Sequence, residues 1–241
     1  MRLQSVTLDD KYTRTDGPVY MTGIQALVRL PMIQAQRDQA AGLNTAGYIS
    51  GYRGSPLGGL DAALWSAQKY LKPHNIKFQP AINEDMGATA VWGSQQANMY
   101  PDAKYDGVFA LWYGKGPGVD RSMDVLKHVN AAGTSKHGGV LLVAGDDHAS
   151  KSSTLPHQSE HMMIGASIPV LNPAGVQEVL DYGIYGWELS RYSGLWVCLK
   201  AITEVMDSSQ VVDSNDHSIA INTPTDFELP ADGMHIRWPD S

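Results

Sequence analysis

The chain has 241 residues, of which 43% are hydrophobic and 18% charged, and this composition is typical of a globular protein with one substantial core. The formal net charge of -7 argues against a nucleic-acid surface, which needs a basic patch. No apolar run reaches the length of about 18 residues that predicts a membrane span. The single cysteine, Cys198, excludes a disulfide framework and a Cys-ligated zinc or iron–sulfur site within this chain. Because no signal-peptide pattern is visible, we expect a reduced, cytoplasmic protein.

Predicted strands and helices alternate along the chain. The first twenty residues are expected to be irregular, and residues 23–41 to form a helix that Pro31 kinks or restarts and Gly42 caps. Strands are then expected at residues 45–50, 76–82, 107–113, 139–144, 168–171 and 195–200. Helices are expected at residues 59–71, 85–99, 119–132 and 174–191, with a short helix at about 202–209.

This alternation predicts an α/β fold, a doubly wound and mostly parallel sheet with helices on both faces. The continuously apolar segment at 139–144 supports a parallel sheet, because central parallel strands are buried on both faces. We expect an N-terminal arm at 1–22, one α/β domain at 23–212 and a C-terminal extension at 213–241.

Ligands of such folds bind beyond the carboxyl ends of the strands, and two of the expected strand ends carry unusual residues. Residues 51–59 read G-Y-R-G-S-P-L-G-G, in which glycines allow close backbone approach and Arg53 can bind a carboxylate or phosphate. A glycine-rich turn with a solvated arginine is the alternative.

A second strand end carries Asn83, Glu84 and Asp85, at the start of the helix expected at 85–99. An acid is favoured at a helix N-terminus, but Asp85 can fill that role alone, which leaves Glu84 as a catalytic candidate.

Two further strand ends also carry unusual residues. Residues 112–121, W-Y-G-K-G-P-G-V-D-R, match neither the P-loop nor the dinucleotide-binding pattern, so we reject nucleotide binding there and expect a tight turn. The polar segment from Asp146 contains Asp147, His148, His157 and His161 and could be interpreted as a metal site. Its spacing fits no standard metal motif, so we favour solvated loop residues.

The four segments in this order resemble the N-terminal domain of indolepyruvate ferredoxin oxidoreductase in its long, fused form, within the 2-oxoacid:ferredoxin oxidoreductase superfamily. The matching motifs are G-Y-R-G-S-P-L-G-G-L-D, N-E-D-x-x-A-T-A-V-W-G-S-Q-Q, W-Y-G-K-G-P-G-V-D-R-S and G-D-D-H-x-x-x-S-S, and the resemblance extends from residues 9–12 to residues 235–240. It implies a thiamine-diphosphate-binding fold in which one domain holds the aminopyrimidine and a second holds the diphosphate with Mg²⁺. This chain resembles the first of the two.

The resemblance also implies roles for individual residues. Glu84 is implied to be the carboxyl group that hydrogen-bonds N1′ of the aminopyrimidine and so activates the cofactor. Arg53 and Ser55 are expected at the 2-oxoacid, although Gly51 stands where a related loop pattern has proline. The remaining cofactor contacts are expected from Gly54, Ser55, Asn83, Lys115, Gly116 and Pro117. No residue of this chain is expected to bind metal.

Parts of the enzyme are absent from this sequence. It has no G-D-G…N motif for diphosphate and Mg²⁺ and no cysteines for [4Fe-4S] clusters, so we expect both in domains outside this chain. The implied reaction is oxidative decarboxylation of an aryl 2-oxoacid, indolepyruvate, with coenzyme A and reduction of ferredoxin. We expect the chain alone to be inactive and to expose an apolar face, which predicts a poorly behaved monomer or a dimer in isolation.

Two alternatives stay open. One is a non-catalytic binding or assembly module, or a degenerate fragment of that enzyme. The other, which we favour least, is a metal hydrolase built on Asp147, His148, His157 and His161.

Overall fold

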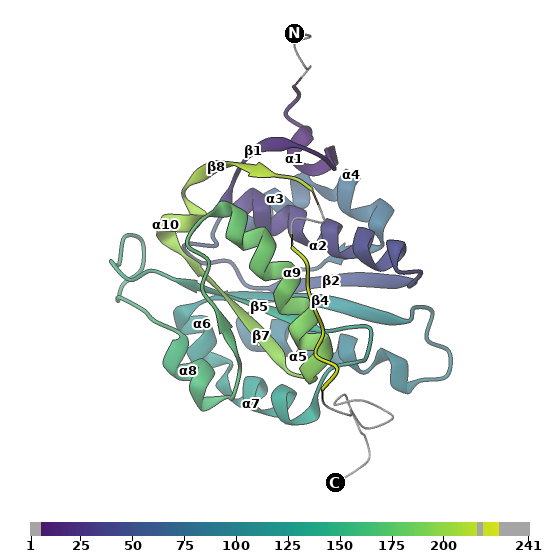
Figure 1. Ribbon diagram of the computed structural model, residues 1–241. Coiled ribbons are helices and arrows are strands. Elements are labelled where there is room, and N and C mark those ends of the chain that lie inside the picture. The colour runs from purple at the N-terminus through teal and green to yellow at the C-terminus, as the bar shows by residue number, and fades with distance from the viewer. Residues whose placement is uncertain (1–5, 216–218, 227–241) are drawn as a thin grey trace.

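The centre of the protein is a six-stranded parallel sheet in the order β3-β2-β4-β5-β7-β6 (Figure 1). The computed structural model describes residues 6–215 and 219–226. The strands are β2 Thr45–Gly51, β3 Ile76–Phe78, β4 Gly107–Lys115, β5 Val140–Asp146, β6 Val170–Leu171 and β7 Trp196–Ile202. The predicted doubly wound α/β fold is confirmed. The strand order reverses between β2 and β4, and in such folds a reversal marks the crevice where ligands bind.

Helices cover both faces of the sheet, as Figure 1 shows. One face carries α2 Gly23–Ala40, α3 Leu60–Ser66, α4 Gln68–Leu71 and α9 Val176–Ser193. The other carries α5 Glu84–Gln95, α6 Gly116–Arg121, α7 Met123–Ala132 and α8 Glu160–Gly165. Alternate strand residues supply the two cores, since Leu141 and Val143 face the first set of helices and Leu142 and Ala144 the second.

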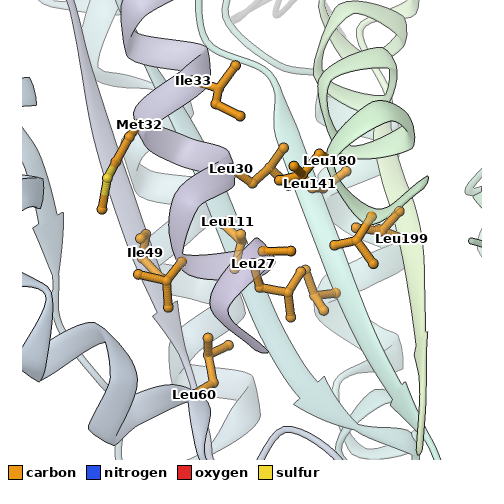
Figure 2. Packing of buried hydrophobic residues seen from close by; sticks show 14 of the residues in the cluster. Leu27, Leu30, Met32, Ile33, Ile49, Leu60, Leu111, Leu141, Leu180 and Leu199 are labelled. Atoms are coloured by element: carbon orange, nitrogen blue, oxygen red, sulfur yellow. The ribbon is translucent and has the colours of Figure 1, made fainter. Parts of the chain in front are cut away.

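The larger core lies between the sheet and the pair α2 and α9. Leu27 and Leu30 of α2 point toward the strand residues Leu111, Leu141 and Leu199 (Figure 2). A side chain at Gly183 of α9 would overlap Leu30, so the absence of one lets the two helices approach closely.

Several element boundaries differ from those predicted. Helix α2 continues through Pro31 without restarting. Gly42 ends the helix as predicted, because it has a φ of +79° and the amide of Leu43 donates to the carbonyl of Asp38 at 2.9 Å. The helix expected at 59–71 is two helices that meet at Ala67. Strand β3 ends at Phe78 rather than at residue 82. Helix α6 begins at Gly116, and α8 was not predicted at all.

The N-terminal segment was wrongly expected to be irregular. It contains α1 Asp10–Thr13 and β1 Pro18–Thr22, and β1 pairs antiparallel with β8 Ser209–Asp213, which follows α10 Thr203–Met206. Arg29 of α2 ties this small sheet to the domain, because its guanidinium donates to the carbonyl of Lys11 at 2.8 Å and to that of Ser214 at 3.4 Å. Of the expected extension at 213–241, residues 216–218 and 227–241 lie outside the described residues.

Among the described residues, no helix combines the length and the apolar character that crossing a bilayer requires.

Replacing Leu30 with alanine tests the contact between α2 and α9. Leu30 is fully buried, so Leu30→Ala is expected to lower the free energy of unfolding by about 2–5 kcal/mol. Ile164→Ala is the control, because Ile164 is 72% exposed and its loss should change stability by about 0.5 kcal/mol or less. Urea unfolding measures both, and equal effects of the two substitutions would contradict the packing described here.

Candidate functional site

The segment that joins β4 to α6 is the centre of the candidate site. Its glycines alternate at positions 114, 116 and 118, on either side of Lys115 and Pro117. Side chains of neighbouring segments occupy the space that a Cβ atom would fill at two of them, Glu84 at Gly118 and His157 at Gly116. At Gly114 the Trp112 ring fills that space, and Glu84 Cγ would lie 3.3 Å from the added Cβ. The turn at 112–121 therefore gathers other segments around its backbone.

Glu84 is the first residue of α5 and only 6% of it is exposed. The preceding residue, Asn83, begins the helix by accepting a hydrogen bond from the amide of Met86 at 2.9 Å. The indole Nε1 of Trp112 donates to the Glu84 carbonyl at 3.0 Å, which fixes the backbone under the side chain. A Cβ added at Gly118 would lie 2.5 Å from Glu84 Cγ and 2.6 Å from Oε1.

Glu84 as a residue is largely buried, and its carboxyl group has no hydrogen-bond donor in the described part of its own chain. Within residues 6–215 and 219–226, no side chain or amide donates a hydrogen bond to it and no cation pairs with it. Buried carboxyl groups normally have such partners. The glycines bring the Glu84 side chain against the backbone of the turn, and the arrangement leaves its oxygens free for a ligand.

The segment after β2 lies beside this turn. The amide of Tyr52 donates to the carbonyl of Tyr113 at 3.0 Å and so extends the pairing of β2 with β4. Gly54 packs against Lys115, whose Cδ would lie 2.6 Å from a Cβ at that glycine. Arg53 is exposed on the same segment.

Ser55 joins the same segment to the loop after β5, because its hydroxyl hydrogen-bonds that of Ser152. The peptide bond between Ser55 and Pro56 is cis. Pro56 and Leu57 are buried against Gly145 of β5, where a Cβ would lie 3.1 Å from either side chain. The first and fourth predicted segments are therefore in contact.

Asp147 organises the loop after β5. Its carboxylate accepts hydrogen bonds from the amides of Lys151 at 2.9 Å, Ser152 at 2.9 Å and Ser153 at 3.1 Å. The amide of Ser152, with those of Lys151 and Ser153, lowers the pKa of Asp147 below its ordinary value against the opposing effect of burial.

The interpretation of this loop as solvated was therefore wrong for Asp146 and Asp147, of which 0% and 1% are exposed, and right for His148 and His161. The side chains of the described residues form no group of three or more His, Cys, Asp or Glu that could hold a metal ion.

His157 reaches the turn from the opposite side, whereas the sequence suggested for it only a solvated position or a place in the least favoured metal site. Its ring lies over Gly116, with Nε2 2.9 Å from Asp120 Oδ2 and Nδ1 3.5 Å from Asp146 Oδ1. These three residues are distant in the sequence, so no spacing pattern reveals the cluster. The alternating glycines at 114–118 were the available signal, because such a pattern marks backbone that other groups approach closely.

The structure thus gathers Gly54, Asn83, Glu84, Lys115 and Gly116 at one edge of the sheet. Pro117 is exposed on α6 beside them. These residues come from three segments that follow β2, β3 and β4, the strands on either side of the reversal in strand order.

Comparisons with known proteins found relatives by sequence and by structure. No protein-family model matches the chain. The chain is 28% identical over 170 residues to indolepyruvate oxidoreductase subunit IorA of Methanothermobacter marburgensis, covering 70% of this chain and 25% of that protein. It is 26% identical over 207 residues to the IorA subunit of Methanothermobacter thermautotrophicus, covering 86% of this chain and 30% of the relative.

A solved 2-oxoglutarate:ferredoxin oxidoreductase from Magnetococcus marinus shares the fold. It has 16% sequence identity and a TM-score of 0.67 and covers 94% of this chain, which spans 38% of that enzyme's chain. The chain is similar in sequence and in fold to enzymes of the 2-oxoacid:ferredoxin oxidoreductase family. It spans less than a third of the length of these two curated relatives.

The contact between Glu84 and Gly118 can be tested with a methyl group. Gly118→Ala is expected to lower the free energy of unfolding by about 1–3 kcal/mol, because the added Cβ overlaps the Glu84 side chain. The loss should shrink when Glu84 is also replaced by alanine, as a double-mutant cycle measures. Gly93→Ala, on α5 with no atom within 4 Å of its added Cβ, is the control. Equal losses from Gly118→Ala with and without Glu84 would contradict the contact.

The loop after β5 should depend on the ionised form of Asp147. The pKa of Asp147 is lowered in the folded protein, so its carboxylate should hold the loop in place at any pH above the ordinary Asp pKa of about 3.9. This ordering of the loop should be lost as the pH falls through the lowered pKa of the folded protein. NMR signals of the amides at 151–153 should follow this titration. In Asp147→Asn they should already be shifted at neutral pH, and in Asp102→Asn, at an exposed site, they should not. Unchanged signals in Asp147→Asn would show that the carboxylate does not order the loop.

Proposed function

We propose that this chain is the pyrimidine-binding half of a thiamine-diphosphate-dependent 2-oxoacid:ferredoxin oxidoreductase. One observation carries the proposal: the carboxyl group of Glu84, a residue that is only 6% exposed, lies at the carboxyl edge of the sheet, beside the reversal in strand order, and has no donor from the described residues. A carboxyl group without a protein partner at such an edge is available to a ligand, which supports a binding role.

The surroundings of Glu84 fit a flat aromatic ring with a ring nitrogen at its edge. Gly114 and Gly118 leave the carboxyl side chain against bare backbone. Ile82 and Met86, on either side of Glu84 in the sequence, are 80% and 53% exposed and offer apolar surface to a ring or to the domain that covers it.

The proposed task of Glu84 is to share a proton with N1′ of the aminopyrimidine through one carboxyl oxygen. Bound thiamine diphosphate supplies the electron sink for decarboxylation of the 2-oxoacid. The glycine backbone restricts the position of the Glu84 side chain, so the proton is held at a fixed place. Aspartate would be one methylene too short to make the same contact from this helix position.

The neighbouring residues are proposed to complete the site. Gly54, Ser55, Asn83, Lys115, Gly116 and Pro117 line the cofactor side, and Arg53 with Ser55 face the 2-oxoacid. The exposure of Arg53 and the partial exposure of Lys115 support this, because cations near the open edge can attract an anionic substrate. No residue of this chain is assigned to Mg²⁺.

The rest of the enzyme is proposed to lie in other domains or chains. The names of the curated relatives support indolepyruvate, an aryl 2-oxoacid, as the substrate. Coenzyme A as acceptor, ferredoxin as oxidant, diphosphate-bound Mg²⁺ and [4Fe-4S] clusters complete the proposed reaction, and dimerisation of this chain is part of the same proposal. The chain by itself is then inactive, because half of the cofactor site is missing.

Titration of thiamine diphosphate and Mg²⁺ by calorimetry tests the proposal. The chain is titrated alone and then with the remaining domains of a homologous enzyme supplied as a separate polypeptide. Binding is expected only in the mixture, and Glu84→Gln should lower the rate of ferredoxin reduction by about 10²-fold or more, because it removes a positioned proton-transfer group.

Asp85→Asn is the matched control, since Asp85 is the next residue and forms a half-exposed pair with Arg121 at 3.2 Å. It should keep near-normal turnover. Normal turnover in Glu84→Gln would overturn the catalytic assignment. A mixture that neither binds the cofactor nor turns over would favour the alternative of a non-catalytic binding module.

A further inference from the structure

His157 joins the loop after β5 to helix α6, whose other side packs against Glu84. The imidazole ring covers Gly116, the first residue of α6, and a methyl group at that position would overlap it. Its Nε2 atom lies 2.9 Å from Asp120 Oδ2, one turn further along the same helix. Only 15% of the His157 side chain is exposed, so this contact is largely shielded from water.

Helix α6 needs external support to keep its position. It has six residues, Gly116–Arg121, and three of them are Gly116, Pro117 and Gly118. Glycine is a poor helix former, and a helix of this length is not stable by itself. Val119 is buried in the core, but the side of the helix that carries Asp120 depends on His157.

The far side of the His157 ring faces the end of the sheet without a hydrogen bond from Nδ1. Its Nδ1 atom faces Asp146 Oδ1 at 3.5 Å, at the end of β5. Asp146 is itself fixed by Ser159, whose amide and hydroxyl donate at 2.9 and 2.7 Å, and by Lys200 of β7 at 3.5 Å. Lys200 also pairs with Glu160 of α8.

The charged groups around the His157 ring are therefore Asp120 from α6 and Asp146 from β5, with Lys200 from β7 and Glu160 from α8 behind Asp146. Because Asp146 is held by β7 and α8 as well as by its own strand, it gives the ring a rigid support.

We propose that His157 is a positioning residue for the candidate site. By donating from Nε2 to Asp120 while its ring lies between Gly116 and Asp146, it sets the place of the Gly116–Gly118 backbone against which the Glu84 side chain packs. This inference deepens the proposed function and rests on it for the role of Glu84. The contact between His157 and α6 can nevertheless be measured without any cofactor.

Two amide substitutions separate hydrogen bonding from packing. The side-chain amide of glutamine can place a donor near the position of Nε2, whereas that of asparagine reaches only as far as Nδ1. His157→Gln should therefore keep the link to Asp120 and His157→Asn should lose it. The reporter is hydrogen exchange of the Ser122 amide, which donates to the Gly118 carbonyl at 3.1 Å at the end of α6.

In the 241-residue chain, the Ser122 amide should exchange about tenfold faster in His157→Asn and within about threefold of the wild-type rate in His157→Gln. His128→Asn, on α7 with 63% of its side chain exposed, is the control and should have no effect. If circular dichroism shows that His157→Asn is not folded, Asp120→Asn replaces it. Asp120 is 48% exposed, and the substitution weakens the same bond from the other end, so faster exchange is again expected.

The second readout is the affinity of the complemented enzyme for thiamine diphosphate, which should fall several-fold in His157→Asn and recover in His157→Gln. Wild-type exchange rates in both His157→Asn and Asp120→Asn, or equal rates in the Asn and Gln variants, would overturn the positioning role. If His157→Asn speeds up exchange but keeps wild-type affinity for thiamine diphosphate, while Glu84→Gln lowers that affinity, the link between His157 and Glu84 is overturned. Wild-type affinity in Glu84→Gln would instead overturn the proposed function and leave the exchange result standing.

Discussion

Side chains from the segments after β3 and β5 can reach the backbone of residues 114–118 because three of these residues have no side chain. Glu84 packs against Gly118 and Gly114, and His157 covers Gly116. Lys115, between the glycines, lies against Gly54 in the segment after β2. A Cβ at any of the three positions would displace a group of the candidate site, so the arrangement of the whole edge depends on this constraint.

The parallel sheet explains why these segments meet. Strands β2, β4 and β5 are neighbours with the same direction, so their carboxyl ends and the loops that follow lie at one edge. The buried residues on both faces, including Leu30 of α2 and Trp112 of β4, keep the strands in register beneath that edge. Stability of the core and geometry of the candidate site are thus linked through β4, which has a buried residue at seven of its nine positions.

Much of the fold was predictable, because the apolar strand at 139–144 and the helices between strands follow from periodicity. The pairing of β1 with β8 was not predictable, since it joins Val19 to Val212 across most of the chain and neither strand has a distinctive pattern. The sequence pointed to Glu84 through its place after a strand and through the family resemblance. It could not show that Gly118 makes room for it.

The contacts within the loop after β5 could not be predicted from the sequence either. Asp146 and Asp147 appear in the sequence as polar residues of a loop, yet both are buried and hold the loop through backbone amides and Ser159. The partners of a carboxylate are set by the path of the chain, which composition does not encode. His157 acquires its contacts with Asp120 and Asp146 for the same reason.

The proposed contact between the Glu84 carboxyl group and N1′ of the aminopyrimidine can be measured directly. The measurement is the ¹⁵N NMR signal of thiamine diphosphate labelled at N1′, bound to this chain together with the remaining domains of a homologous enzyme. With the wild-type chain the signal should move away from its position in free cofactor, and with Glu84→Gln it should move much less. The same bound-state signal in both proteins would show that Glu84 does not touch this nitrogen and would overturn its proposed role.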